Sequence, residues 1–133
     1  MAYIDANIFI YAISKDAAES DACMSILDSI VRGKIPATTC TLTWDEVIHG
    51  VAHNKGREEA AAAGEALLAI PRLKIIPADR EMISLAQRIY TTYGLKPRDS
   101  IHAACAILQG EREIYSMDSD FDKVKELKRK EPK

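Results

Sequence analysis

Four short apolar segments constrain the fold of this chain more than any other feature of its sequence. They lie at residues 2–4, 35–39, 73–76 and 113–116, and helical patterns fill most of the chain between them. Short, continuously apolar segments are typical of strands buried on both faces, and their alternation with helices is typical of helical crossovers between parallel strands. The sequence therefore predicts an α/β fold with a parallel sheet covered by helices on both faces.

The helical patterns place the predicted helices between these strands. The clearest is an amphipathic stripe from residue 79 to residue 93, which Asp79 caps and Gly94 ends. A short turn or helix is predicted at 118–123. The other helices are predicted to begin near residue 7 and to cover about 17–31, 43–53, 57–69 and 97–110.

Length and composition are those of one ordinary domain. The 133 residues are predicted to form a single domain, 1–133, and no apolar run approaches the roughly 20 residues of a membrane span, so no membrane partner is expected. The three cysteines are far apart, which is typical of reduced thiols in a cytoplasmic protein.

The charge of the chain is unevenly distributed. Residues 123–133 carry six of the 18 Lys and Arg residues but two of the 20 acids, whereas the net charge of the whole chain is −2. We interpret 123–133 as a basic C-terminal tail. Contact with a polyanion and simple solvation explain such a tail equally well.

Four acids stand at the junctions between predicted elements. Asp5 and Asp118 each follow a strand, Glu46 lies one turn into a helix, and Asp99 lies in the first turn of another helix. The carboxyl ends of parallel strands share one edge, where ligands bind. Carboxylates that meet there repel each other and require a cation, and an all-oxygen site suits Mg²⁺ or Mn²⁺.

Helix capping explains each of these acids when it is taken alone. Acids are favoured at helix starts because they accept hydrogen bonds there and complement the helix dipole. The segment from Thr43 to Glu46 matches a capping box, and Asp118 has the position of an N-cap. Spacing alone therefore leaves both interpretations open.

Four motifs in register resemble those of PIN-domain ribonucleases, and together they cover nearly the whole chain. Residues 4–11 resemble the opening D-x-N motif, and residues 43–47 resemble the second motif, whose acid is Glu46. Residues 97–104 are similar to the third motif, whose acid is Asp99. Residues 116–122 are similar to the closing motif, S/T-x-D-x-D-F-D.

The resemblance implies a three-layer α/β/α sandwich with a central, mostly parallel sheet and a metal-dependent ribonuclease activity. Its implied site consists of Asp5, Glu46, Asp99 and Asp118. A chain of this length most resembles the VapC-type toxins of toxin–antitoxin pairs, which implies an RNA substrate, a protein antitoxin and a homodimer.

The resemblance also implies roles for these acids. Asp5, Asp99 and Asp118 would bind Mg²⁺, for which Mn²⁺ would substitute, and Glu46 would hold a second ion or orient the attacking water. Two ions can activate water and stabilise the leaving oxygen of a phosphodiester. Asp120 competes with Asp118 for its role and is otherwise an outer ligand.

Five further residues are candidates for supporting roles. We expect Asn7 to hydrogen-bond Asp5, and Ser116 to orient the neighbouring carboxylates. Lys96, Arg98 and His102 are candidate RNA contacts, and for His102 we favour a structural role over contact with RNA.

Two other functions remain open at the level of sequence. One is an RNA-processing or quality-control PIN nuclease without an antitoxin. The other is a non-catalytic, RNA-binding PIN-like module, against which the presence of all four acids counts.

Overall fold

The computed structural model describes residues 2–15 and 17–133. Its strands form one sheet in the order β3-β2-β1-β4-β5, and every neighbouring pair is parallel. This confirms the prediction of a parallel α/β fold. The strands are β1 (Ala2–Ile4), β2 (Ala37–Cys40), β3 (Leu73–Ile76), β4 (Glu113–Tyr115) and β5 (Lys128–Lys130).

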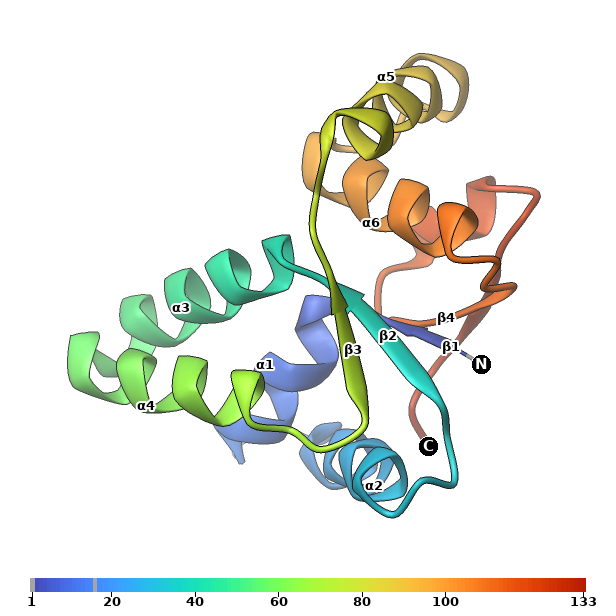
Figure 1. Ribbon diagram of the computed structural model, residues 1–133. Helices are drawn as coiled ribbons and strands as arrows, with labels where there is room; N and C mark the ends of the chain where they lie inside the picture. Colours follow the sequence, from blue (N-terminus) through green and yellow to red (C-terminus); the bar gives the residue numbers. More distant parts are fainter. Residues whose placement is uncertain (1, 16) are drawn as a thin grey trace.

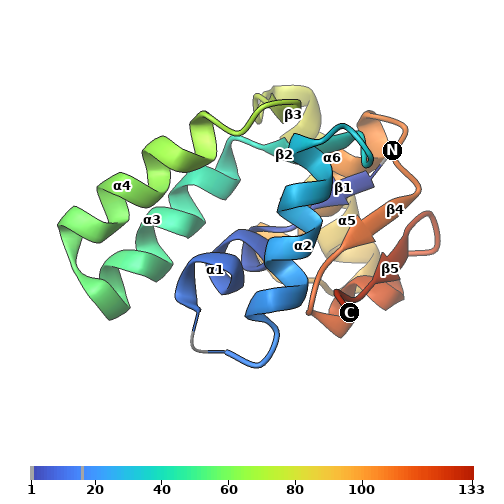
Figure 2. The same ribbon diagram turned by 90° about the horizontal axis from the view of Figure 1, so that it is seen from below.

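Helices cover both faces of the sheet and complete three layers (Figures 1 and 2). Helices α5 and α6 pack together on one face, while α1 to α4 lie on the other, where α3 and α4 form a hairpin that projects from the body. The helices are α1 (Ala6–Ser14), α2 (Ser20–Val31), α3 (Leu42–Lys55), α4 (Arg57–Leu68), α5 (Arg80–Tyr93), α6 (Pro97–Leu108) and the short 3₁₀ helix η1 (Ser119–Lys123). Among the described residues, no helix has the length and apolar character needed to cross a bilayer.

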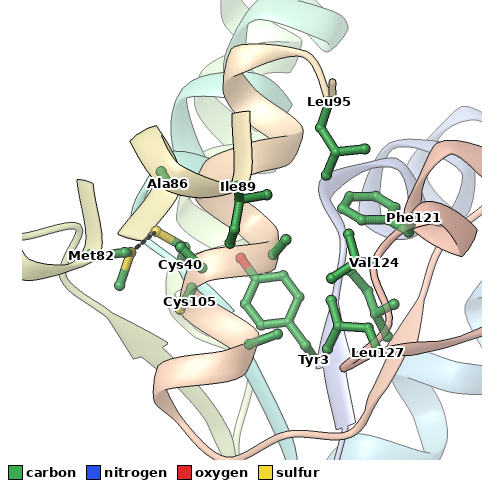
Figure 3. Packing of buried hydrophobic residues seen from close by; sticks show 14 residues of the cluster. Tyr3, Cys40, Met82, Ala86, Ile89, Leu95, Cys105, Phe121, Val124 and Leu127 are labelled. Atoms are coloured by element: carbon green, nitrogen blue, oxygen red, sulfur yellow. Dashed lines mark hydrogen bonds between the residues drawn. The ribbon is translucent and has the colours of Figure 1, made fainter. Parts of the chain in front are cut away.

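Two apolar clusters form the core, one on each face of the sheet. Successive strand residues point to opposite faces, so Tyr3 packs with α5 and α6 whereas Ile4 packs with α1 and the α3–α4 hairpin. Figure 3 shows the cluster around Tyr3, which includes the buried free thiols of Cys40 and Cys105. The clusters hold the central strand β1 in place, and the chain turns into α1 where that strand ends.

The predicted strand boundaries agree with the structure to within about two residues. Strand β3 has the predicted bounds, whereas β2 begins at Ala37 and not at residue 35. Pro36 has no N–H to donate to a strand ladder, although its carbonyl accepts a hydrogen bond from the Ala2 amide at 3.0 Å. The strand therefore begins only after the proline.

The structure corrects the interpretation of residues 123–133 as a basic tail. Lys128–Lys130 pair with β4 as the edge strand β5, and Val124 and Leu127 are buried in the core. Arg129 forms ion pairs with Asp122 at 3.0 Å and Glu131 at 2.8 Å. No apolar strand pattern marks this segment, because charged residues dominate it. Such a segment can still form a strand at the edge of a sheet, where charged side chains are tolerated.

We predict that Leu127→Ala lowers the free energy of unfolding by about 2–5 kcal/mol, because it removes buried methyl groups from the core. Chemical denaturation followed by circular dichroism measures this change. The exposed neighbour Lys128 supplies the control, since Lys128→Ala should change stability by less than about 0.5 kcal/mol. Equal and small effects of both substitutions would show that the segment is not packed in solution.

Candidate functional site

The four junction acids lie at the edge formed by the carboxyl ends of β1, β2 and β4. Asp5 directly follows β1, and Asp118 follows β4 after two residues. Glu46 lies in the second turn of α3, the helix that follows β2. Asp99 reaches the same edge from the first turn of α6. The parallel sheet therefore brings together acids that are up to 113 positions apart in the sequence.

Asp5 is the most deeply buried of these acids. Its side chain is 5% exposed, and its two oxygens accept hydrogen bonds from the Ala6 amide at 2.8 Å and from the Ser116 hydroxyl at 2.7 Å. Burial raises the pKa of Asp5 above its ordinary value, although His102 and the Ser116 hydroxyl counteract this increase. The carboxylate is thus held in one orientation by groups that favour its charged form.

The Ser116 hydroxyl connects three parts of the site. It donates to Asp5 and accepts hydrogen bonds from the Asp118 amide at 3.0 Å and the Asn7 amide side chain at 3.3 Å. One donor and two acceptors are the full capacity of a hydroxyl. The contact between Ser116 and a carboxylate is as predicted. The contact of Asn7 differs, because its side chain reaches Ser116 and the Met117 amide instead of Asp5.

Asp99, Asp118 and Asp120 form a compact acidic cluster. Each offers a carboxylate oxygen, and these oxygens lie within 4.8 Å of one another. Burial, followed by the negative charges of Asp5 and Asp118, raises the pKa of Asp99 to about 7. A cation bound between these oxygens would relieve the repulsion, and an all-oxygen set suits Mg²⁺ or Mn²⁺.

Asp118 and Asp120 differ in their other contacts. Asp118 is tied to Ser116 through its backbone amide, whereas Asp120 lies 3.6 Å from the Lys123 ammonium group at the surface. Both lie within reach of Asp99. The contacts thus make Asp118 the acid more closely joined to the buried part of the site.

Capping accounts for two of the four junction acids. The Asp5 carboxylate caps α1, and the Asp118 carboxylate caps η1 by accepting from the Asp120 amide at 2.9 Å. Glu46 forms no capping box, because α3 begins at Leu42 and Thr43 lies inside it. The hydroxyl of Thr43 instead contacts that of Thr39 at 2.7 Å. Capping hydrogen bonds therefore explain neither Glu46 nor Asp99, although Asp99 lies in the first turn of α6, where an acid complements the helix dipole.

His102 occupies the space between two of the acids. Its Nε2 contacts Glu46 and lies 3.6 Å from Asp5 Oδ1, and its Nδ1 lies 2.5 Å from the hydroxyl of Tyr3. Burial lowers the pKa of His102, but the hydrogen bond to Glu46 and the charge of Asp5 raise it overall to about 9. The side chain is 0% exposed, so the structure corrects the prediction that His102 is a candidate RNA contact.

A cleft of about 570 Å³ opens over the acids. Three of them, Glu46, Asp99 and Asp118, line it. Exposed Lys96 and Arg98 line it together with Pro97, at the start of α6. Positive side chains beside a group of carboxylates suit a phosphodiester ligand, because the phosphate would contact the lysine and arginine side chains next to the acids.

Tyr3 is the residue of this network that the sequence analysis missed. The sequence contains no signal for this role, since a tyrosine inside a buried strand predicts only packing in the core. Its hydroxyl reaches a histidine 99 positions away, and only the crossing of β1 beside α6 brings the two together.

Comparison with known proteins agrees with this architecture. The family model described as "PIN domain" matches residues 2–127. Ribonuclease VapC7 of Mycobacterium tuberculosis is 26% identical over 122 residues, which are 91% of this chain and 84% of that protein.

Solved structures of similar proteins share the fold over nearly their whole length. VapBC2 from Rickettsia felis, bound to a promoter DNA fragment, has a TM-score of 0.77 at 19% identity and covers 100% of both chains. VapC20 from Mycobacterium tuberculosis, a toxin that cleaves the sarcin–ricin loop, has a TM-score of 0.79 at 15% identity, over 92% of this chain and 93% of that one.

The raised pKa of Asp99 predicts how the stability of the metal-free protein changes with pH. A folded-state pKa of about 7, above the ordinary value, means that Asp99 supports folding at low pH. That contribution is lost as the pH rises from about 4 to about 8. The unsubstituted protein loses this contribution and Asp99→Asn does not. In EDTA, the melting temperature of Asp99→Asn minus that of the unsubstituted protein should therefore increase as the pH rises over this range.

Differential scanning calorimetry measures this difference. Asp45→Asn is the matched control, because Asp45 is exposed on the surface of α3. Its melting-temperature difference should stay constant with pH. A constant difference for Asp99→Asn as well would contradict the predicted repulsion at the acidic cluster.

Proposed function

The chain belongs to the PIN-domain family, and on that premise we propose that it is a metal-dependent endoribonuclease, the toxin of a VapBC-like toxin–antitoxin pair. One observation carries the proposal. Asp5, Glu46, Asp99 and Asp118 converge at one sheet edge, beneath a cleft with basic residues along its rim.

The relatives support the toxin assignment. Ribonuclease VapC7 matches 91% of the chain, and the VapBC complexes of similar fold are toxins held by their antitoxins. A further structure of this fold is a toxin–antitoxin complex from Klebsiella pneumoniae, with a TM-score of 0.68. We accordingly propose a protein antitoxin, a homodimer, and action on RNA in the cytoplasm.

The acids fit the hard cation that the family implies. Asp99 and Asp118, whose oxygens cluster with one of Asp120, would hold Mg²⁺ or Mn²⁺. Asp5 would complete the set with Asp120 as an outer ligand, and Glu46, which lines the cleft, would hold a second ion or orient the attacking water. One ion, or two about 4 Å apart, would activate the water and stabilise the leaving oxygen of the phosphodiester. The all-oxygen donor set and the raised pKa of Asp99 support this assignment.

Side chains of the protein would bind the RNA and orient the attacking water. Lys96 and Arg98 bind the phosphates on either side of the bond to be cut, and so place it over the acids. The carboxylate of Glu46, which lines the cleft, accepts a hydrogen bond from the attacking water. Ser116 keeps the Asp5 carboxylate in its orientation. Hydrolysis forms one P–O bond between the water oxygen and the phosphorus. It breaks one P–O bond of the RNA backbone, and the oxygen that leaves takes up a proton.

The first test is cleavage of total cellular RNA by the purified protein. We expect cleavage with Mg²⁺ and with Mn²⁺, no cleavage in EDTA, and a loss of at least about 100-fold in Asp99→Asn. Asp45→Asn, the exposed control on α3, should cleave at the unsubstituted rate. Cleavage by Asp99→Asn at that same rate would refute the assignment of the site.

A second test concerns the basic rim of the cleft. Arg98→Ala should weaken RNA binding and reduce the slope of log K against log salt by about 1, the loss of one phosphate contact. The measurement is fluorescence anisotropy of labelled single-stranded RNA over a series of salt concentrations. Arg88→Ala on α5, exposed and outside the cleft lining, should leave the slope unchanged. Equal slopes for both variants would place the RNA elsewhere on the surface.

A further inference from the structure

We propose that His102 is a positioning residue, which holds Glu46 and Asp5 in the orientation that binds metal, and that the Tyr3 hydroxyl holds its imidazole with Nε2–H toward these acids. This inference rests on the proposed function, because it concerns the same acids. It goes beyond it by giving a task to a buried histidine and a buried tyrosine that contact no RNA and line no cleft.

The position of the Glu46 carboxylate depends on its contact with His102. Asp5 is held by a backbone amide and by Ser116, and Asp118 is held through its backbone. Within residues 2–15 and 17–133, the only hydrogen bond to the Glu46 side chain comes from His102 Nε2. A glutamate has three rotatable side-chain bonds, so without this contact its carboxylate would sample several positions.

The chemistry of the contact determines where the imidazole carries its proton. An ionised carboxylate only accepts hydrogen bonds, so His102 Nε2 must carry the hydrogen that faces Glu46 and Asp5. In the neutral ring, Nδ1 is then an acceptor and receives the Tyr3 hydroxyl hydrogen; in the charged ring, Nδ1 donates to the same oxygen. Tyr3 therefore fixes the tautomer of the neutral ring, and in the charged ring, which has no tautomers, it fixes the orientation that points Nε2–H at Glu46.

Among the described residues, His102 Nδ1 is the hydrogen-bond partner that the geometry gives the Tyr3 hydroxyl, and Thr39 and Cys105 lie beside it. The Tyr3 ring stands among the apolar side chains of the core on the α5 and α6 side (Figure 3), and it is fully buried. The rings of Tyr3 and His102 are tilted by 60° at 5.6 Å between centroids. The rigid core thus fixes Tyr3, Tyr3 fixes the imidazole, and the imidazole fixes Glu46.

The experiment separates positioning from packing by measuring Mn²⁺ affinity and stability on the same full-length variants. His102→Leu removes the donor to Glu46 but leaves the Tyr3 hydroxyl unpaired. The double variant with Tyr3→Phe removes that hydroxyl as well, so it should regain part of the lost melting temperature. Ile107→Ala, a partly buried change on the same helix that packs against the same apolar cluster, is the control for packing.

Titration calorimetry with MnCl₂ measures the affinity. His102→Leu should weaken Mn²⁺ binding about tenfold or more, and the double variant should remain equally weak although its stability recovers. Tyr3→Phe alone should weaken binding less, and His102→Gln, which keeps an N–H donor, should restore part of the affinity. Ile107→Ala should bind Mn²⁺ with unchanged affinity.

Normal Mn²⁺ affinity in His102→Leu and the double variant would overturn the inference and leave His102 a residue of the core. The ¹⁵N shifts of the His102 ring give a test in the unsubstituted protein, since an unprotonated Nε2 would also overturn it. Mn²⁺ binding by the unsubstituted protein and by Asp99→Asn distinguishes a failure of this inference from a failure of the proposed function. If the unsubstituted protein binds no Mn²⁺, or binds it equally well without Asp99, then the proposed metal site fails and this inference fails with it.

Discussion

Repulsion between carboxylates at one edge of the sheet is the constraint on which the site depends. Asp5, Asp99 and Asp118 are brought together by the ends of β1 and β4 and by the start of α6. Burial and mutual repulsion raise the pKa of Asp99, so the folded chain holds these groups at a cost when no cation is present. The rest of the fold must supply the stability that keeps them there.

The sheet and the two apolar clusters supply that stability. Each face of β1 packs against a separate helical layer, so the strand that ends at Asp5 is fixed from both sides. The last strand, β5, pairs with β4 and stabilises the segment that follows it. The Ser116 amide donates to the Lys130 carbonyl at 3.1 Å, and Arg129 donates to the Ser116 carbonyl at 3.3 Å. The residue that orients Asp5 is thereby anchored by the C-terminal segment.

Much of this could be predicted from local sequence. Apolar segments revealed β1 to β4, because buried strands need continuous apolar residues, and the D-x-N and S-x-D-x-D-F-D motifs located the acids. Strand β5 could not be predicted, since its three basic residues pair at a sheet edge where charge is tolerated. Nor could the contacts of His102, because its place one helical turn after an acid favoured a structural role without identifying the residues that it contacts.

The sequence by itself determined the order of the helices and of strands β1 to β4, the positions of the acids at their junctions, and the family to which the chain belongs. These features are local, since they depend on the spacing of residue types along the chain. Only the tertiary structure decided that Ser116 bonds Asp5, that His102 lies between Asp5 and Glu46, and that Tyr3 supports it. Those contacts join residues 56 to 111 positions apart, and the packing of α6 and β4 around β1 sets their geometry.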